Sequence, residues 1–160
     1  MKVYRLERKQ TLPISIERAW DYFSDPSNLS EITPPDLGFQ VLSDLPDRMF
    51  PGMVISYHLR PLLGIRVRWV TEITHVDEPY SFVDEQRFGP YRFWHHRHTF
   101  EEVDGGVLMT DVVHYAMRFR LIGRMARRLM VRERLEGIFD FRHTVLSNRF
   151  GEAGVAEENP

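Results

Sequence analysis

The spacing of apolar residues changes from a period of two to a period of 3.6 near residue 120, and this change constrains the fold more than any other feature of the chain. Between about residues 38 and 117, apolar and polar side chains alternate, which predicts a series of β-strands. From there to Phe150, apolar residues recur at helical spacing, which predicts one long helix of about 28 residues. This order favours an α+β fold, in which an antiparallel sheet carries its helices on one face.

Turn residues divide the alternating region into strands. With a further strand at the N-terminus, the predicted strands cover residues 2–11, 39–41, 53–60, 65–74, 82–88, 93–100 and 109–115. The strongest turn signal is Asp104-Gly105, which is typical of a two-residue hairpin. Such a turn sets the register, and it predicts four opposed pairs: Phe100 with Met109, His98 with Asp111, His96 with Val113, and Trp94 with Tyr115. A three-residue turn would exchange the two faces of the strand.

Two short helices are expected after the first strand. Ser15 can cap a helix over residues 16–24, with Glu17 in its first turn. Asp25-Pro26 then starts a second helix, because Asp is a good N-cap and Pro is favoured at the first helical position. The two prolines that follow Thr33 end this second helix.

Length and composition limit the possible classes of protein. The 160 residues are expected to form one domain over residues 2–150, followed by a flexible acidic tail over residues 151–160. The chain contains no cysteine, which excludes disulfides, a thiol nucleophile and cysteine-ligated metals. Its net charge of −2 predicts no nucleic-acid partner. No apolar run is long enough for a membrane span or a signal peptide, so we expect a cytoplasmic protein.

Three segments carry a resemblance to a known superfamily. They are ISIERAWDYFSDPSNLSEITPP (14–35), FVDEQRFGPYRFWHHRHTFEEVDGGVLMTDVVHY (82–115) and LEGIFDFRHTVLSNRF (135–150). The chain resembles the START-like (SRPBCC) helix-grip proteins, and within them a bacterial ligand-binding subgroup similar to polyketide cyclases and dehydrases. The resemblance implies a curved antiparallel sheet of about seven strands, with the long C-terminal helix covering an internal cavity. No catalytic motif comes with it.

The alternation of the strands predicts which side chains look into this cavity. On most strands the inner face is apolar, but on the last three it also carries carboxyl, amide and imidazole groups. The predicted ligand-binding residues are Tyr57, Trp69, Asp84, Gln86, Trp94, His96, His98, Asp111, Tyr115, Leu135 and Phe139. Burying unpaired polar groups is costly, so these groups must pair with each other, bind water or contact a ligand.

Three interpretations of the polar groups stay open. They can form a structural network in which Asp111 satisfies His98. They can orient a small ligand at one end of an apolar pocket. They can also perform catalysis or bind a metal, because His-x-His with a nearby Asp has the spacing of Zn²⁺ or Fe²⁺ ligands. A third strong ligand is not assured by the sequence, so no metal and no cofactor is predicted.

The expected function is binding, with transport as an extension, of a small hydrophobic molecule such as a lipid, a quinone or a polyketide-like compound. The first alternative is an enzyme of cyclase or dehydratase type, with His98 and Asp111 as the acid–base pair. In that case His96 or Tyr57 would polarise a carbonyl. The second alternative is an accessory domain without a ligand.

Seven arginines flank the start of the long helix: Arg118, Arg120, Arg124, Arg127, Arg128, Arg132 and Arg134. One interpretation is a solvated basic face. The other is transient contact with an anionic membrane through Arg124, Arg127 and Arg128. The sequence leaves the oligomeric state open between a monomer and a weak dimer.

Overall fold

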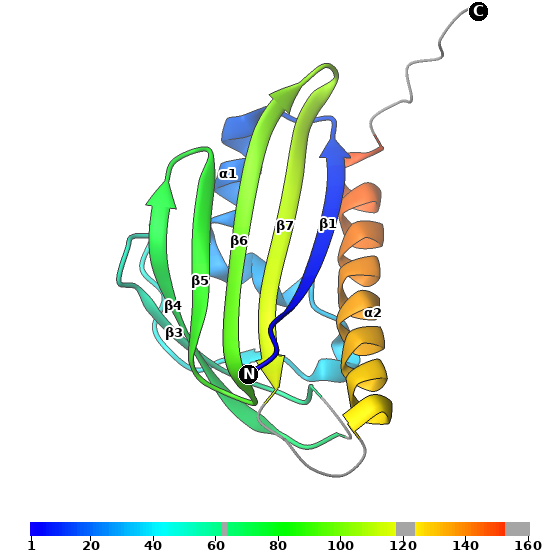
Figure 1. The fold of residues 1–160 in the computed structure, drawn as a ribbon. Helices are drawn as coiled ribbons and strands as arrows, with labels where there is room; N and C mark the ends of the chain where they lie inside the picture. Colours follow the sequence, from blue (N-terminus) through cyan, green and yellow to red (C-terminus); the bar gives the residue numbers. More distant parts are fainter. Residues whose placement is uncertain (62–63, 118–123, 153–160) are drawn as a thin grey trace, which may run out of the picture.

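The computed structural model describes residues 1–61, 64–117 and 124–152, and the side chains of residues 124–128 are not described. Within these ranges seven strands form one antiparallel sheet, accompanied by two α-helices and two short 3-10 helices (Figure 1). The elements are β1 (Tyr4–Leu12), α1 (Ile16–Phe23), η1 (Pro26–Ser30), η2 (Pro35–Leu37), β2 (Gln40–Val41), β3 (Val54–Leu59), β4 (Val67–Asp77), β5 (Ser81–Phe88), β6 (Tyr91–Val103), β7 (Gly106–Met117) and α2 (Arg124–Phe150).

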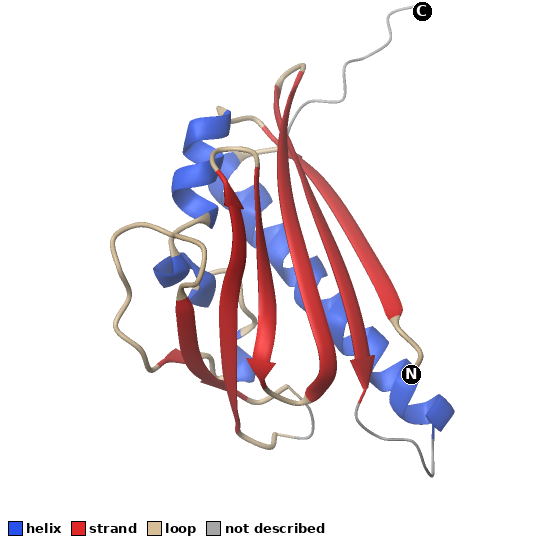
Figure 2. Cartoon of the chain, turned by 60° about the vertical axis from the view of Figure 1, so that its left-hand side comes forward, coloured by secondary structure: helices blue, strands red, loops and turns tan. Residues whose placement is uncertain are grey.

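The sheet has the order β1-β7-β6-β5-β4-β3-β2, so the first strand lies beside the last. The sheet is curved and does not close, and both α-helices lie on the same side of it (Figure 2). The predicted α+β class, the seven antiparallel strands and the long terminal helix are all confirmed. This arrangement is the helix-grip fold.

The hairpin between β6 and β7 has the register that its turn residues predict. Val103 pairs with Gly106 around the two-residue turn, and His98 lies opposite Asp111. At Gly106, where φ is +148°, an added Cβ would lie 2.0 Å from the carbonyl oxygen of Leu12. Only glycine therefore lets the end of β1 approach the hairpin so closely.

The two helices pack against different parts of the sheet. Ser15 caps α1 by accepting a hydrogen bond from the backbone N–H of Arg18. Trp20 of α1 meets the rings of Phe82 and Phe100 edge-on. Helix α2 buries a stripe of side chains against the sheet. These side chains recur every three or four residues, which is the spacing expected of an amphipathic helix. The buried apolar residues of this stripe are Val131, Leu135, Phe139 and Leu146.

Some local predictions differ from the structure. After Asp25, which accepts a hydrogen bond from the backbone N–H of Ser27, the chain forms the short 3-10 helix η1 in place of an α-helix. A second such turn, η2, begins at the second of the two prolines, Pro35, because the first position of a helix needs no backbone N–H. Strand β4 begins at Val67, and Ile65, which was expected within the strand, is exposed.

In the described part of the chain, none of the helices combines the length and the apolar character that crossing a membrane requires. The prediction of membrane contact falls on Arg124, Arg127 and Arg128, whose side chains are not among those that the structure describes. Most of the predicted tail, residues 153–160, lies outside the described residues as well.

Candidate functional site

A cavity of about 180 Å³ lies between the inner face of the sheet, helix α2 and the segment from α1 to η2. Most of its wall is apolar or aromatic. The sheet contributes Tyr57, Trp69 and Trp94, α2 contributes Leu135, Ile138 and Phe139, and the N-terminal segment contributes Phe23, Ile32 and Leu37. A volume of this order accepts a molecule of one or two rings, since an engineered cavity of about 150 Å³ in another protein binds benzene.

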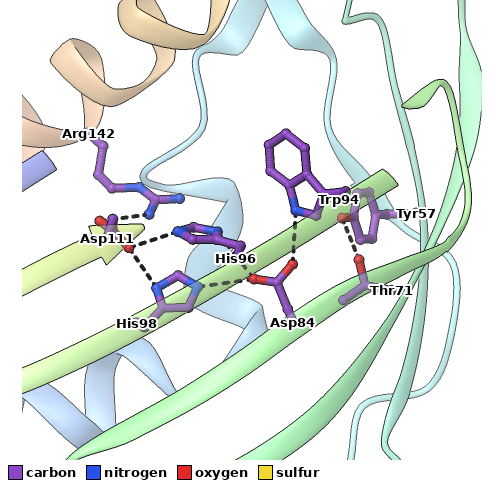
Figure 3. Close-up of polar contacts among 8 residues, drawn as sticks. All are labelled: Tyr57, Thr71, Asp84, Trp94, His96, His98, Asp111 and Arg142. Carbon is purple, nitrogen blue, oxygen red and sulfur yellow. Dashed lines mark hydrogen bonds and ion pairs between the residues drawn. The ribbon is translucent and has the colours of Figure 1, made fainter. Parts of the chain in front are cut away.

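A cluster of charged groups from three neighbouring strands lies at one wall of the cavity (Figure 3), and its members on β5 and β6 line that wall. Strand pairing places Asp84 of β5 opposite His96 of β6, and His98 of β6 opposite Asp111 of β7. Because His96 and His98 are two residues apart on one strand, both rings point to the same face of the sheet. Both rings are buried, and their centres lie 3.8 Å apart.

The two carboxylates lie at opposite ends of the two imidazole rings (Figure 3). His96 Nε2 is hydrogen-bonded to Asp111 Oδ1 at 2.9 Å, and His98 Nε2 to Asp84 Oδ2 at 3.1 Å. The remaining ring nitrogens also face carboxylate oxygens: His96 Nδ1 lies 3.2 Å from Asp84 Oδ2, and His98 Nδ1 lies 2.8 Å from Asp111 Oδ1. The last contact is close enough for an ion pair but makes no hydrogen bond. All four ring nitrogens are thus in contact with a carboxylate.

Arg142 links this cluster to helix α2. Its Nη1 lies 3.5 Å from Oδ2 of Asp111, and its guanidinium stacks on the ring of Phe139, 5.0 Å from the centroid. Both partners of the ion pair are buried. The sequence prediction missed this residue, although a signal exists: Arg142 continues the buried stripe of α2, four residues before Leu146.

Opposing effects set the protonation of the cluster. Burial alone would lower the pKa of His96, but the charge of Asp84 and the hydrogen bond to Asp111 raise it to about 9. Burial would raise the pKa of Asp84, and the adjacent imidazoles lower it below its usual range. Asp111 follows the same pattern with His98 and Arg142, so its pKa is also lowered. The cluster therefore holds two carboxylates beside the imidazolium of His96 and the guanidinium of Arg142.

A pair of hydroxyl groups lies on the cavity wall near this cluster. Tyr57 Oη and Thr71 Oγ1 are 2.9 Å apart, and both residues line the cavity. Burial raises the pKa of the Tyr57 phenol, so the group stays protonated at neutral pH. Two hydroxyl groups carry two protons, and one hydrogen bond between them uses one. The second proton is available to an acceptor in the cavity.

The structure brings most of the predicted ligand-binding residues to the cavity. Tyr57, Trp69, Asp84, Trp94, His96, His98, Leu135 and Phe139 line it. Their role in binding stays a prediction.

Three residues predicted on this wall, Asp111, Gln86 and Tyr115, are not among those that line the cavity. Asp111 lies behind the two imidazoles and is 1% exposed. Gln86 turns its amide to the backbone of Tyr91, where it closes the turn between β5 and β6. Tyr115 packs against Tyr4 and Tyr91, toward the β1 edge of the sheet. Alternation along the strands assigns all three side chains to the inner face of the sheet. Contacts with neighbouring residues keep each of them from lining the cavity.

Solved structures share this fold at low sequence identity. Protein Ms6760 from Mycobacterium smegmatis is 22% identical, with a TM-score of 0.62, and the match covers 93% of this chain and 98% of that one. Protein CV1439 from Chromobacterium violaceum is 16% identical, with a TM-score of 0.67 and coverage of 94% and 99%. The protein Ara h 8.0201 is 16% identical, with a TM-score of 0.59 and coverage of 92% and 99%. At these identities the likeness concerns the fold alone.

Comparison with curated proteins finds no match. The family model described as "Polyketide cyclase / dehydrase and lipid transport", in contrast, matches residues 4–150. This range runs from the first residue of β1 to the last residue of α2, so it includes every element that forms the cavity. The chain belongs to the polyketide cyclase/dehydrase and lipid transport family.

Proposed function

We propose that this protein reversibly binds a small, largely apolar molecule that has one polar or carbonyl end. The observation that carries the proposal is the cavity of about 180 Å³, whose wall is mostly apolar and includes hydroxyl and charged groups on the sheet. Binding sites for small molecules commonly combine an apolar lining with a few polar groups that converge. The family description, which names polyketides and lipids, supports the same class of ligand.

The apolar wall supplies the affinity of the proposed complex. Each Å² of apolar surface removed from water contributes about 25 cal/mol. Rings such as Trp69 and Trp94, which meet edge to face at 5.2 Å, offer a stiff surface for a flat ligand. A ligand of one or two rings fits this wall better than a long flexible chain.

The polar wall orients the ligand. The free proton of the Tyr57–Thr71 pair is a donor for a carbonyl oxygen. Asp84 is the least buried member of the charged cluster, and it is an acceptor for a hydroxyl of the ligand. A ligand with a carbonyl therefore lies with that group toward β3 and β4.

The test is a binding titration with two matched probes, a naphthyl methyl ketone and the ethylnaphthalene that lacks its carbonyl oxygen. We expect saturable binding of both, with the ketone tighter by about fivefold to tenfold because of one added hydrogen bond. Native mass spectrometry of the purified protein would in addition reveal a co-purified hydrophobic molecule. Absence of saturable binding for either probe, together with no co-purified molecule, would leave the ligand-free accessory domain.

An enzyme of cyclase or dehydratase type is a second candidate, and one observation favours it. The buried imidazole of His98 is hydrogen-bonded to the carboxylate of Asp84 and forms part of the cavity wall, which is an arrangement suited to general acid–base chemistry. The variant His98→Gln separates the two candidates. In a carrier it leaves ligand affinity within about tenfold, whereas in an enzyme it lowers turnover by about 10²-fold or more.

A further inference from the structure

We propose that Asp84, His96 and His98 form a binding site for a divalent transition-metal ion on the wall of the cavity. This site goes beyond the proposed function and does not depend on it. Its basis is the convergence of two imidazole nitrogens and one carboxylate oxygen, with a second carboxylate behind both rings (Figure 3).

The donor atoms have the spacing that a metal ion requires. Asp84 Oδ2 lies 3.2 Å from His96 Nδ1 and 3.1 Å from His98 Nε2, and one ligand atom from each residue falls within 4.8 Å of the others. Bonds from zinc to nitrogen or oxygen are about 2.0–2.2 Å long, which places neighbouring ligand atoms about 3 Å apart. The ion can therefore sit among the three donors after small side-chain rotations.

Asp111 is an outer carboxylate of the proposed site, which means that it contacts the histidine rings and not the metal ion. Its Oδ1 lies 2.9 Å from His96 Nε2 and 2.8 Å from His98 Nδ1, which are the nitrogens on the far side of each ring. Metal-binding histidines usually donate their second N–H to such a carboxylate, which fixes the tautomer and the direction of the ring. In the protein without metal, His98 Nε2 and the imidazolium of His96 face Asp84 Oδ2 with their protons. A divalent ion that binds among the three donor atoms takes the place of these protons, so its binding releases them.

Two further contacts hold the arrangement in place. Trp94 Nε1 donates to Asp84 Oδ1 at 3.3 Å, which leaves Oδ2 as the coordinating oxygen. Arg142 lies 3.5 Å from Asp111 Oδ2 and offsets the charge of this outer carboxylate. The guanidinium charge cancels that of Asp111, so Asp84 and a divalent ion leave one positive charge. The site thus favours an anionic oxygen as an additional ligand.

The donor set indicates which ions bind. Two imidazoles and one carboxylate suit Zn²⁺, Fe²⁺, Co²⁺ or Ni²⁺ rather than Ca²⁺ or Mg²⁺, which prefer oxygen alone. Because all three residues line the cavity, the open coordination positions face it. A carboxylate or enolate oxygen of a molecule in the cavity is the class of ligand that would complete the coordination.

The test uses the full chain without a histidine tag, freed of metal with a chelator and titrated with Co²⁺ alone. We expect one equivalent to bind with micromolar or tighter affinity, and the visible absorption of Co²⁺ to change to that of a nitrogen-ligated ion. Asp84→Asn and His98→Gln should abolish the spectral change. Asp111→Asn, which removes the outer carboxylate charge, should weaken affinity about 10-fold to 100-fold.

His95→Gln is the matched control, because His95 is on the same strand but alternates to the other face, where its ring lies 6.1 Å from that of His114. This variant should bind Co²⁺ as the wild type does. Two outcomes would overturn the proposal: no Co²⁺ binding by the wild type at micromolar concentration, or binding that is lost in His95→Gln and retained in Asp84→Asn. If Asp111→Asn does not fold, as judged by circular dichroism, Asp84→Asn still tests the metal site. The side chain of Asp84 is less buried than that of Asp111, and asparagine has nearly the same shape as aspartate.

Discussion

Arg142 on helix α2 and Asp111 on strand β7 form a buried ion pair between the helix and the sheet, with 3.5 Å between Nη1 and Oδ2. Asp111 lies behind the imidazoles, and Arg142 itself lines the cavity. The Arg142–Asp111 ion pair therefore links the packing of α2 on the sheet to the charge of the cluster.

Arg142→Met should destabilise the protein strongly. The substitution keeps much of the side-chain length but leaves Asp111 with one positive partner fewer in a buried environment, at a cost of about 3 kcal/mol. Arg132→Met is the control on the same helix, because Arg132 pairs with Glu136 at the surface and should contribute no more than about 0.5 kcal/mol. Urea denaturation measures both, and equal effects would show that the buried pair does not stabilise the contact between helix and sheet.

The stability of the chelator-treated protein should depend on pH through the cluster. The pKa of His96 is raised from 6.5 to about 9, so its contribution is complete below pH 6.5 and is lost as the pH rises through 9. The pKa values of Asp84 and Asp111 are lowered from 3.8, so their contributions are present above that value and are lost as the pH falls below it. The cluster should therefore stabilise most between pH 3.8 and pH 6.5.

The measurement is the free energy of unfolding as a function of pH, for wild type and His96→Gln. The groups that face His96 are Asp84 on β5, His98 on β6, Asp111 on β7 and Arg142 on α2. Loss of the decline between pH 6.5 and pH 9 in the variant would assign that decline to His96. An unchanged decline would assign it to other groups.

The double variant Tyr57→Phe/Thr71→Val should weaken binding of the naphthyl ketone by about fivefold to tenfold, because it removes both hydroxyl groups and with them a hydrogen-bond donor worth about 1 kcal/mol. Binding of ethylnaphthalene should stay the same, since the ring is retained. Tyr80→Phe is the control, as Tyr80 is 54% exposed and does not line the cavity. Equal loss for both probes would mean that Tyr57 and Thr71 shape the cavity rather than recognising a carbonyl.

Two glycines should respond in opposite ways to alanine. Gly106→Ala places a Cβ 2.0 Å from the Leu12 carbonyl oxygen at a positive φ, so we expect a loss of about 2 kcal/mol or more. Gly137→Ala, in the exposed middle of α2 with no atom near the new Cβ, should gain about 0.5–1 kcal/mol. Thermal unfolding of both variants tests this pair, and a stabilised Gly106→Ala would contradict the close approach of β1 to the hairpin.

The hairpin between β6 and β7 has the register that its sequence predicts. Asp104-Gly105 specifies a two-residue turn, and alternation then assigns His96, His98 and Asp111 to one face. Both effects act between residues close in the chain, so the register of β6 and β7 could be predicted without knowledge of the rest of the fold.

Pairing between side chains was less predictable. The strand register makes a His98–Asp111 hydrogen bond feasible, and His98 Nδ1 does lie 2.8 Å from Asp111 Oδ1. The hydrogen bond to Asp111, however, comes from the neighbouring His96, and His98 is hydrogen-bonded to Asp84. The direction of a ring depends on its rotamer and on sheet twist, neither of which follows from alternation. Gln86 shows the same limit, since its amide is taken by the backbone of Tyr91.

The amino-acid order alone therefore determined most of the elements, their sequence along the chain and the faces of β6 and β7, because these depend on local periodicity and turn chemistry. Only the tertiary structure decided that Arg142 lies against Asp111, that a cavity stays open beside Trp69, and that four ring nitrogens meet two carboxylates. Those relations depend on how one long helix lies across a curved sheet. The position of the helix is set by contacts between residues far apart in the chain, which local periodicity does not specify.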